Sequence, residues 1–281
     1  MEPHFDRFKG VSCRGYTFAI RHPVAHRKPP MRIVPALTLV AALFAGTAHA
    51  DTVKVLTAGA FKQVVVALVP AFEARTGHKV EVLNDTAGAL AKRVEGGEAF
   101  DVLILTPAGL QPLVAKGTVA PGLQPLAQVG IGVAVKAGTP VPDVSTLPLF
   151  RQALLAAHKV AYIDPASGGS SGIYLNGLFR KMGLAEQMRG KAVLVPGGLV
   201  AERLVTGEAD LAVHQISEIL PVAGVTLAGP LPAEVQNTTT YIGAVAARPA
   251  HPEAAQAFLA ALAAPEAAEV LRAKGMEPPA R

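Results

Sequence analysis

The chain contains a single cysteine, Cys13, and no tryptophan in 281 residues. Residues 51–281 have no cysteine, which excludes disulfides, a thiolate nucleophile and thiolate metal ligands from that part of the protein. The four histidines of this part, His78, His158, His214 and His251, are scattered, and no HExxH motif occurs. The sequence therefore predicts no metal site and no cofactor.

Residues 51–281 also lack an excess of charge of either sign. The chain has 26 Lys and Arg against 21 Asp and Glu, and residues 1–50 hold seven of the basic and two of the acidic residues. The remainder is balanced at 19 of each, so the high sequence pI belongs to the first 50 residues. Because no basic cluster remains, we expect no nucleic-acid partner.

Apolar runs long enough to span a bilayer are absent as well. The apolar run 33–45 is too short for that purpose. Arg32 precedes it and Ala48-His49-Ala50 follows, which is the order of a cleavable secretory signal. We expect a periplasmic protein that begins at Asp51 and has no membrane span after cleavage. Residues 1–30 precede a second possible start, Met31, and are either a mis-assigned start or an extended signal.

Apolar β-branched runs alternate with helical patterns along the rest of the chain. Continuous apolar strands separated by helices are typical of parallel sheets covered on both faces. The βα units are too many for one sheet, so the sequence predicts an α/β protein with two lobes, residues 51–129 plus 233–281 and residues 130–232. Two crossing points are expected. The first is Gly130-Ile131-Gly132, which lies within a predicted strand 129–135, and the second is the segment 229–232. Two crossings form a hinge, and the cleft between the lobes is the expected ligand site.

Four loops of small residues follow predicted strands: 57–60, 84–88, 164–172 and 196–198. Each leads into a predicted helix, whose first N–H groups and dipole favour an anion. Ordinary helix capping explains any one such loop. The run of three Ser and three Gly in 167–172 exceeds what a cap needs, and none of the loops contains Lys or Arg. The pattern favours an anion held by neutral donors.

The loops and several motifs resemble the periplasmic molybdate-binding proteins of ABC transporters. The motifs are TGHKVEV, TAGALAKRVEGGEAFDVLIL, DPASGGSSGIY and GEADLAVHQISEI, and the resemblance covers residues 51–281. It implies a type II, Venus-flytrap binding-protein fold, a monomer, and capture of a tetrahedral oxyanion by hydroxyls, backbone N–H groups and a tyrosine.

The resemblance also implies positions for the ligand contacts. The family's two serines fall on Ala60 and Thr86, and its tyrosine falls on Gln215 or, with a shift of one, His214. The loss of the first serine and of the tyrosine argues against molybdate itself. The His214-Gln215 pair and the glycine-rich loop 167–172 indicate a larger or differently shaped anion. The implied ligand-binding residues are Gly59, Ala60, Thr86, Ser170, Ser171, Gly197, Gly198, His214 and Gln215.

Two functions follow from the same cleft. The first is a receptor that delivers a small anion to an ABC permease. The second is an isomerase, since the periplasmic enzyme aconitate isomerase resembles this family; His214 or Glu218 would then be the base, while Thr86, Ser170 and Ser171 would hold carboxylates. We expect Tyr174 and Tyr241 to serve in packing, and Asp85 to point away from the anion.

Overall fold

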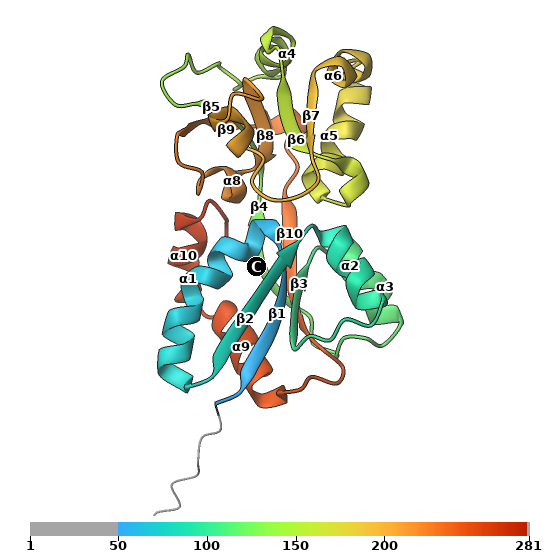
Figure 1. The fold of residues 1–281 in the computed structure, drawn as a ribbon, viewed down its shortest axis with the longest axis vertical. Coiled ribbons are helices and arrows are strands. Elements are labelled where there is room, and N and C mark those ends of the chain that lie inside the picture. Colours follow the sequence, from blue (N-terminus) through green and yellow to red (C-terminus); the bar gives the residue numbers. More distant parts are fainter. Residues whose placement is uncertain (1–49, 280–281) are drawn as a thin grey trace, which may run out of the picture. The chain divides into compact units, whose positions relative to one another are not determined.

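The structure is a computed structural model and describes residues 50–279. The predicted signal segment lies outside these residues. The described chain is a mixed α/β structure with two five-stranded sheets, ordered β2-β1-β3-β10-β4 and β7-β6-β8-β5-β9 (Figure 1). Among the described residues, no single helix has the length and apolar character to cross a membrane; the bent pair α9 (Pro252–Leu262) and α10 (Ala267–Ala273) meets the criteria of length and composition only when joined.

The first lobe is built around the sheet that contains the first strand. Its strands are β1 (Thr52–Ala58), β2 (Lys79–Asp85), β3 (Val102–Leu105), β4 (Gln124–Val129) and β10 (Thr239–Val245). Its helices are α1 (Gly59–Thr76), α2 (Ala87–Glu95) and α3 (Pro107–Ala115), together with α9 and α10. Strand β3 is buried along its whole length, as the apolar run DVLIL predicts.

The second lobe is built around the other sheet. Its strands are β5 (Ile131–Lys136), β6 (Val160–Ile163), β7 (Ala192–Val195), β8 (Leu211–Gln215) and β9 (Val225–Pro230). Its helices are α4 (Leu147–Ala156), α5 (Ser170–Lys181), α6 (Ala185–Lys191), α7 (Glu202–Val205) and α8 (Ile216–Ile219), with a 3-10 turn η1 (Pro165–Ser167). Successive residues of β6 alternate between two apolar cores, since Tyr162 packs in one and Ile163 in the other.

The sheets are mixed, which corrects the expectation of purely parallel sheets. Strand β10 runs antiparallel to β3 and β4, and β5 runs antiparallel to β8 and β9. Strands β5 and β10 are each the first strand after a crossing between the lobes. Each therefore enters its sheet at the edge where the parallel strands end, and must run in the opposite direction.

The predicted strand 129–135 is in fact two strands that belong to different sheets. Strand β4 ends at Val129 and β5 begins at Ile131, with Gly130 between them. The return crossing follows the 3-10 turn η2 (Ala233–Val235), because Leu231 and Val235 still pack in a core of the second lobe. The lobe boundaries at 130 and 233 remain predictions.

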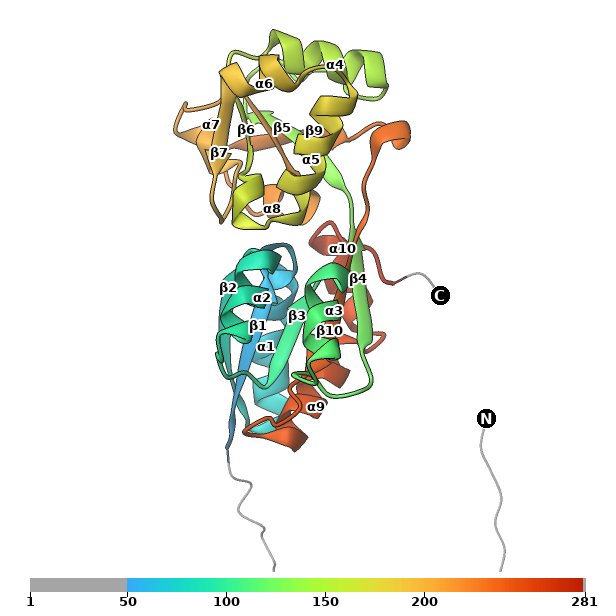
Figure 2. The ribbon, with the colours of Figure 1, turned by 90° about the vertical axis from the view of Figure 1, so that its right-hand side faces the viewer.

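The two crossing segments lie side by side and are joined by one side chain (Figure 2). The Gln236 Oε1 accepts from the Ile131 N at 2.8 Å, and the Gln236 Nε2 donates to the Ile131 O at 2.9 Å. The amide thus pairs with the backbone as a neighbouring strand would. This contact fixes the crossing segments at the point where the lobes are connected.

Candidate functional site

A cavity lies where strands of both lobes end. It encloses about 30 Å³, room for about two water molecules. A larger ligand therefore requires the lobes to separate first. The lining residues are Ala58, Gly59, Ala60, Asn84, Asp85, Thr86, Ala87, Ile163, Gly169, Ser170, Ser171, Gly198, His214, Gln215, Glu218 and Tyr241.

The structure brings nine of the ten predicted site residues to this cavity, and Gly197 is the exception. A backbone donor at the next helix start was expected near Gly197 or Gly198, and the helix, predicted from residue 200, begins at Glu202. Residues 199–201 separate the glycines from the helix. Whether the nine contact a ligand stays a prediction.

Two helices point uncapped amino-terminal ends at the cavity. Gly59 and Ala60 open α1, Ser170 and Ser171 open α5, and neither helix has a side-chain cap. The first N–H groups of a helix lack partners within the helix and, with the helix dipole, attract an anion. Of the described residues that line the cavity, none is Lys or Arg. The donors on offer are therefore neutral.

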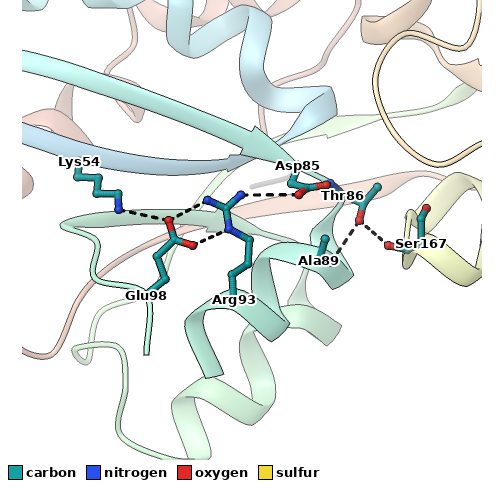
Figure 3. Close-up of polar contacts among 7 residues, drawn as sticks. All are labelled: Lys54, Asp85, Thr86, Ala89, Arg93, Glu98 and Ser167. Atoms are coloured by element: carbon teal, nitrogen blue, oxygen red, sulfur yellow. Dashed lines mark hydrogen bonds and ion pairs between the residues drawn. The ribbon is translucent and has the colours of Figure 1, made fainter. Parts of the chain in front are cut away.

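The Thr86 hydroxyl already makes two hydrogen bonds within the protein. It accepts from the Ala89 N at 3.2 Å, as the cap of α2, and donates to the Ser167 O of the other lobe at 2.5 Å (Figure 3). A hydroxyl has only one hydrogen to donate. Thr86 therefore links the lobes in this closed arrangement, and has no hydrogen left for an anion.

Asp85 lines the cavity, but its charge is balanced. The Asp85 Oδ1 accepts from the Thr86 N at 2.7 Å, and the Asp85 Oδ2 lies 3.7 Å from the Arg93 guanidinium. Arg93 in turn binds Glu98, which also contacts Lys54 at 3.2 Å (Figure 3). The carboxylate is thus drawn toward the α2 side of the cavity by a chain of alternating charges.

His214 and Glu218 form a buried pair at the cavity. The His214 Nε2 lies 3.3 Å from the Glu218 Oε2, and the side chains are 1% and 9% exposed. Burial lowers the pKa of His214 to about 3 and raises the pKa of Glu218 to about 8. Burial thus favours the neutral form of both groups. The His214 Nδ1 and the Ser217 hydroxyl are buried without a partner among the described residues.

The Glu218 carboxyl reaches across to the other lobe. A Cβ atom added to Gly59 would lie 2.6 Å from the Glu218 Oε1, so the carboxyl rests against the first turn of α1. A side chain at position 59 would make the carboxyl move from this place. The buried acid therefore lies beside one of the two helix ends that favour an anion.

Tyr241 is the site residue that the sequence analysis missed. We expected it to serve in packing, but its hydroxyl donates to the Gln215 Oε1 at 2.9 Å. The Gln215 Nε2 donates to the Ser170 Oγ at 3.2 Å.

Gly168 to Gly172 fits the spacing Gly-x-Ser-x-Gly of serine hydrolases. The described partner of the Ser170 hydroxyl is the Gln215 amide and not an imidazole, so the loop does not form that nucleophile.

The chain belongs to the bacterial extracellular solute-binding protein family, whose profile matches residues 53–277. It is 35% identical over 257 residues to a Pseudomonas sp. protein named aconitate isomerase, covering 87% of this chain and 97% of that one. Within the described residues, no group of three or more His, Cys, Asp or Glu is placed to hold a metal ion.

Solved structures show the same fold. The periplasmic molybdate-binding protein of Azotobacter vinelandii matches with a TM-score of 0.69 and 20% identity, over 81% of this chain and 100% of that one. The sulfate-binding protein SubI of Mycobacterium tuberculosis H37Rv matches with a TM-score of 0.65 and 16% identity, over 81% of this chain and 87% of that one. The protein thus has the two-lobed, type II fold of periplasmic binding proteins.

Proposed function

We propose that the cavity binds a small polycarboxylate and moves a proton within it, so that the protein is an isomerase of an unsaturated tricarboxylate such as aconitate. The buried pair of His214 and Glu218 beside two uncapped helix ends carries this proposal. A receptor for an anion needs only donors. A carboxyl group beside the bound anion would repel it whenever ionised, so its presence is best explained by proton exchange with the ligand.

The proposed reaction shifts a proton along the allylic system of the substrate. Glu218, as the carboxylate, takes a proton from the methylene carbon, and a proton is returned to the former vinylic carbon at the other end. One C–H bond breaks and one forms, the double bond moves, and the composition is unchanged. Burial raises the pKa of Glu218 to about 8, close to the value that suits a general base near neutral pH.

The other residues of the cavity would bind and orient the substrate. The helix ends at Gly59 and Ser170 would each receive a carboxylate, with the Ser171 hydroxyl as a further donor. The His214 Nε2 is near enough to Glu218 to share its proton between the two steps. Closure of the lobes would exclude water from the carbanion. A relative named aconitate isomerase, similar over 97% of its length, supports this assignment.

A second candidate is a periplasmic receptor that delivers an anion to an ABC permease. Membership of a solute-binding family favours it. The cavity lining also favours the receptor, because an anion held without Lys or Arg is released easily. In both candidates the protein acts in the periplasm on a small anion, and only the first requires Glu218 to exchange a proton.

The experiment combines a ligand panel with an assay of turnover. Thermal unfolding is measured with molybdate, tungstate, sulfate, citrate and cis-aconitate, because a ligand of the folded form raises the melting temperature. Conversion of cis- to trans-aconitate is followed by chromatography. The proposal expects stabilisation by cis-aconitate, conversion, and its loss in His214→Ala but not in the control His158→Ala. Stabilisation by molybdate without conversion would replace the isomerase with the receptor.

A further inference from the structure

A hydrogen-bonded chain of three side chains connects the lobes at the cavity. Tyr241 lies on β10 of the first lobe, whereas Gln215 and Ser170 belong to β8 and α5 of the second. The Tyr241 hydroxyl donates to the Gln215 Oε1 at 2.9 Å, and the Gln215 Nε2 donates to the Ser170 Oγ at 3.2 Å. All three residues line the cavity.

The fold explains how Tyr241 reaches this place. Strand β10 runs antiparallel to β3, so its first residues lie at the edge where the parallel strands end. The pairing of β10 with β4 shifts register between Tyr241 and Ile242. The extra residue of this irregularity is Leu126 of β4, so Tyr241 itself continues the regular pairing that begins at Thr239. The Tyr241 ring also lies 6.3 Å from the ring of Phe61 in the first turn of α1.

We propose that Tyr241 is a positioning residue that fixes the Gln215 amide and thereby keeps the hydrogen of the Ser170 hydroxyl free for a bound carboxylate. A hydroxyl that accepts from Gln215 has its own hydrogen left to donate. With the amide reversed, Ser170 would donate to Gln215 and be lost to the ligand. Burial raises the pKa of Tyr241 above its usual range, so the phenol stays a donor.

The chain also couples this orientation to closure. Tyr241 and Gln215 lie on different lobes, so their hydrogen bond exists only when the lobes meet. When the cleft is open, Gln215 loses its contact with Tyr241, so nothing fixes the orientation of its amide. The hydroxyl hydrogen of Ser170 is then not kept free for a ligand. Tyr241 therefore completes the anion site at the moment of closure. This step rests on the proposed function only in taking Ser170 as a contact of the ligand.

The test separates binding from turnover, with cis-aconitate as the probe. Tyr241→Phe should raise KM about tenfold and change kcat less than threefold, because it weakens binding in the ground and transition states alike. The matched control is Tyr174→Phe, which removes a 2.7 Å hydrogen bond to the Val235 O outside the cavity. It should leave KM unchanged. If Tyr241 only stabilised the fold, kcat would fall with the active fraction and KM would stay.

A double-mutant cycle tests the link to Ser170. Tyr241→Phe should raise KM little further in a Ser170→Ala background, because the hydroxyl that it positions is gone. Independent, additive effects would overturn the proposal.

A measurement without ligand keeps this result distinct from failure of the proposed function. The Gln215 side-chain amide signals in a ¹⁵N correlation spectrum should move in Tyr241→Phe and stay in Tyr174→Phe. Unmoved signals would overturn the positioning role. Absence of any response to cis-aconitate in the unaltered protein would overturn the isomerase alone.

Discussion

Gly88 and Gly168 meet backbone to backbone across the cleft. The Gly88 N donates to the Gly168 O at 3.1 Å. A Cβ atom added to Gly88 would lie 2.8 Å from the Gly168 Cα, and one added to Gly168 would lie 2.7 Å from the Gly88 Cα. Gly168 also has a φ of +78°, which disfavours other residues. The closed arrangement of the lobes therefore depends on glycine at both positions.

Gly88→Ala should hinder closure without unfolding either lobe. We expect the affinity for the ligand to fall at least tenfold, since the methyl group meets backbone that cannot move aside independently. The measurement is calorimetric titration with cis-aconitate. The control is Gly177→Ala in the middle of α5, where an added Cβ meets nothing within 4 Å. It should raise the free energy of unfolding by about 0.5–1 kcal/mol and leave affinity unchanged. Equal affinities in the two variants would contradict the role of the glycine contact.

The His214–Glu218 pair predicts a pH profile of stability. Burial lowers the pKa of His214 from 6.5 to about 3 and raises the pKa of Glu218 from 4.5 to about 8. From pH 3 to 4.5 the unfolded chain binds a proton at His214 that the folded protein lacks, so the free energy of unfolding rises with pH. From pH 6.5 to 8 the folded protein keeps a proton at Glu218 that the unfolded chain has lost, so it falls. Between these ranges the two effects cancel.

Glu218→Gln removes the upper arm of this profile and the cancellation between pH 4.5 and 6.5, so the rise due to His214 should continue to about pH 6.5. The fall between pH 6.5 and 8 amounts to at most about 2 kcal/mol for one proton and should vanish in the variant, as measured by urea unfolding. The rise at low pH, which belongs to His214, should remain. An identical fall in Glu218→Gln would show that Glu218 is ionised in the folded protein.

The serine at the second position of α5 should contribute to binding. Ser171 is 2% exposed and lines the cavity. Ser171→Ala should weaken binding of the anion by about 1.5–3 kcal/mol, the range for a hydrogen bond to a charged group. Ser167→Ala is the control, because the Ser167 hydroxyl donates to the Asp164 O in the same loop at 2.7 Å. Titration calorimetry that finds the two variants alike would place the ligand elsewhere.

Arg93 should support anion binding from outside the cavity. It balances the charge of Asp85, whose carboxylate would otherwise repel an anion. Because both side chains are more than a third exposed, we expect Arg93→Met to lower affinity only about threefold at low salt. Adding Asp85→Asn to Arg93→Met should restore the affinity. A salt concentration of about 0.5 M should remove nearly all of the difference in affinity between Arg93→Met and the unaltered protein. A loss that persists in the double variant would mean that Arg93 acts through the fold.

The sequence predicted the type of fold because its signals are local. The buried run 101–105 marks a strand by composition alone, and the glycine-rich loop 164–172 marks a loop that reaches the cavity. The glycines at 130 and 132 indicated a crossing, but the end of one strand and the start of the next were hidden, because residues on both sides are apolar and only their partners in different sheets separate β4 from β5. A pattern with period two cannot show such a change of sheet.

The site was predictable only where parallel strands end. His214 lies near the end of β8 and Glu218 lies in α8, which follows β8 directly, so their place at the cavity follows from the order of the chain. Tyr241 stands near the beginning of its strand, and it reaches the cavity because β10 is antiparallel to β3 and so begins at the edge where the parallel strands end. This direction depends on pairing between distant segments, and no local pattern in the sequence indicates it.

The proton transfer assigned to Glu218 is tested most directly by proton NMR of cis-aconitate in D₂O. With the unaltered protein, the signals of trans-aconitate should grow and deuterium should enter the product. Glu218→Gln should lower turnover by about 10²–10⁴-fold, the usual worth of a general base. The Glu218→Gln variant should still have a higher melting temperature in the presence of cis-aconitate than in its absence. Isomerisation at an unchanged rate in Glu218→Gln, or none in the unaltered protein, would contradict the account.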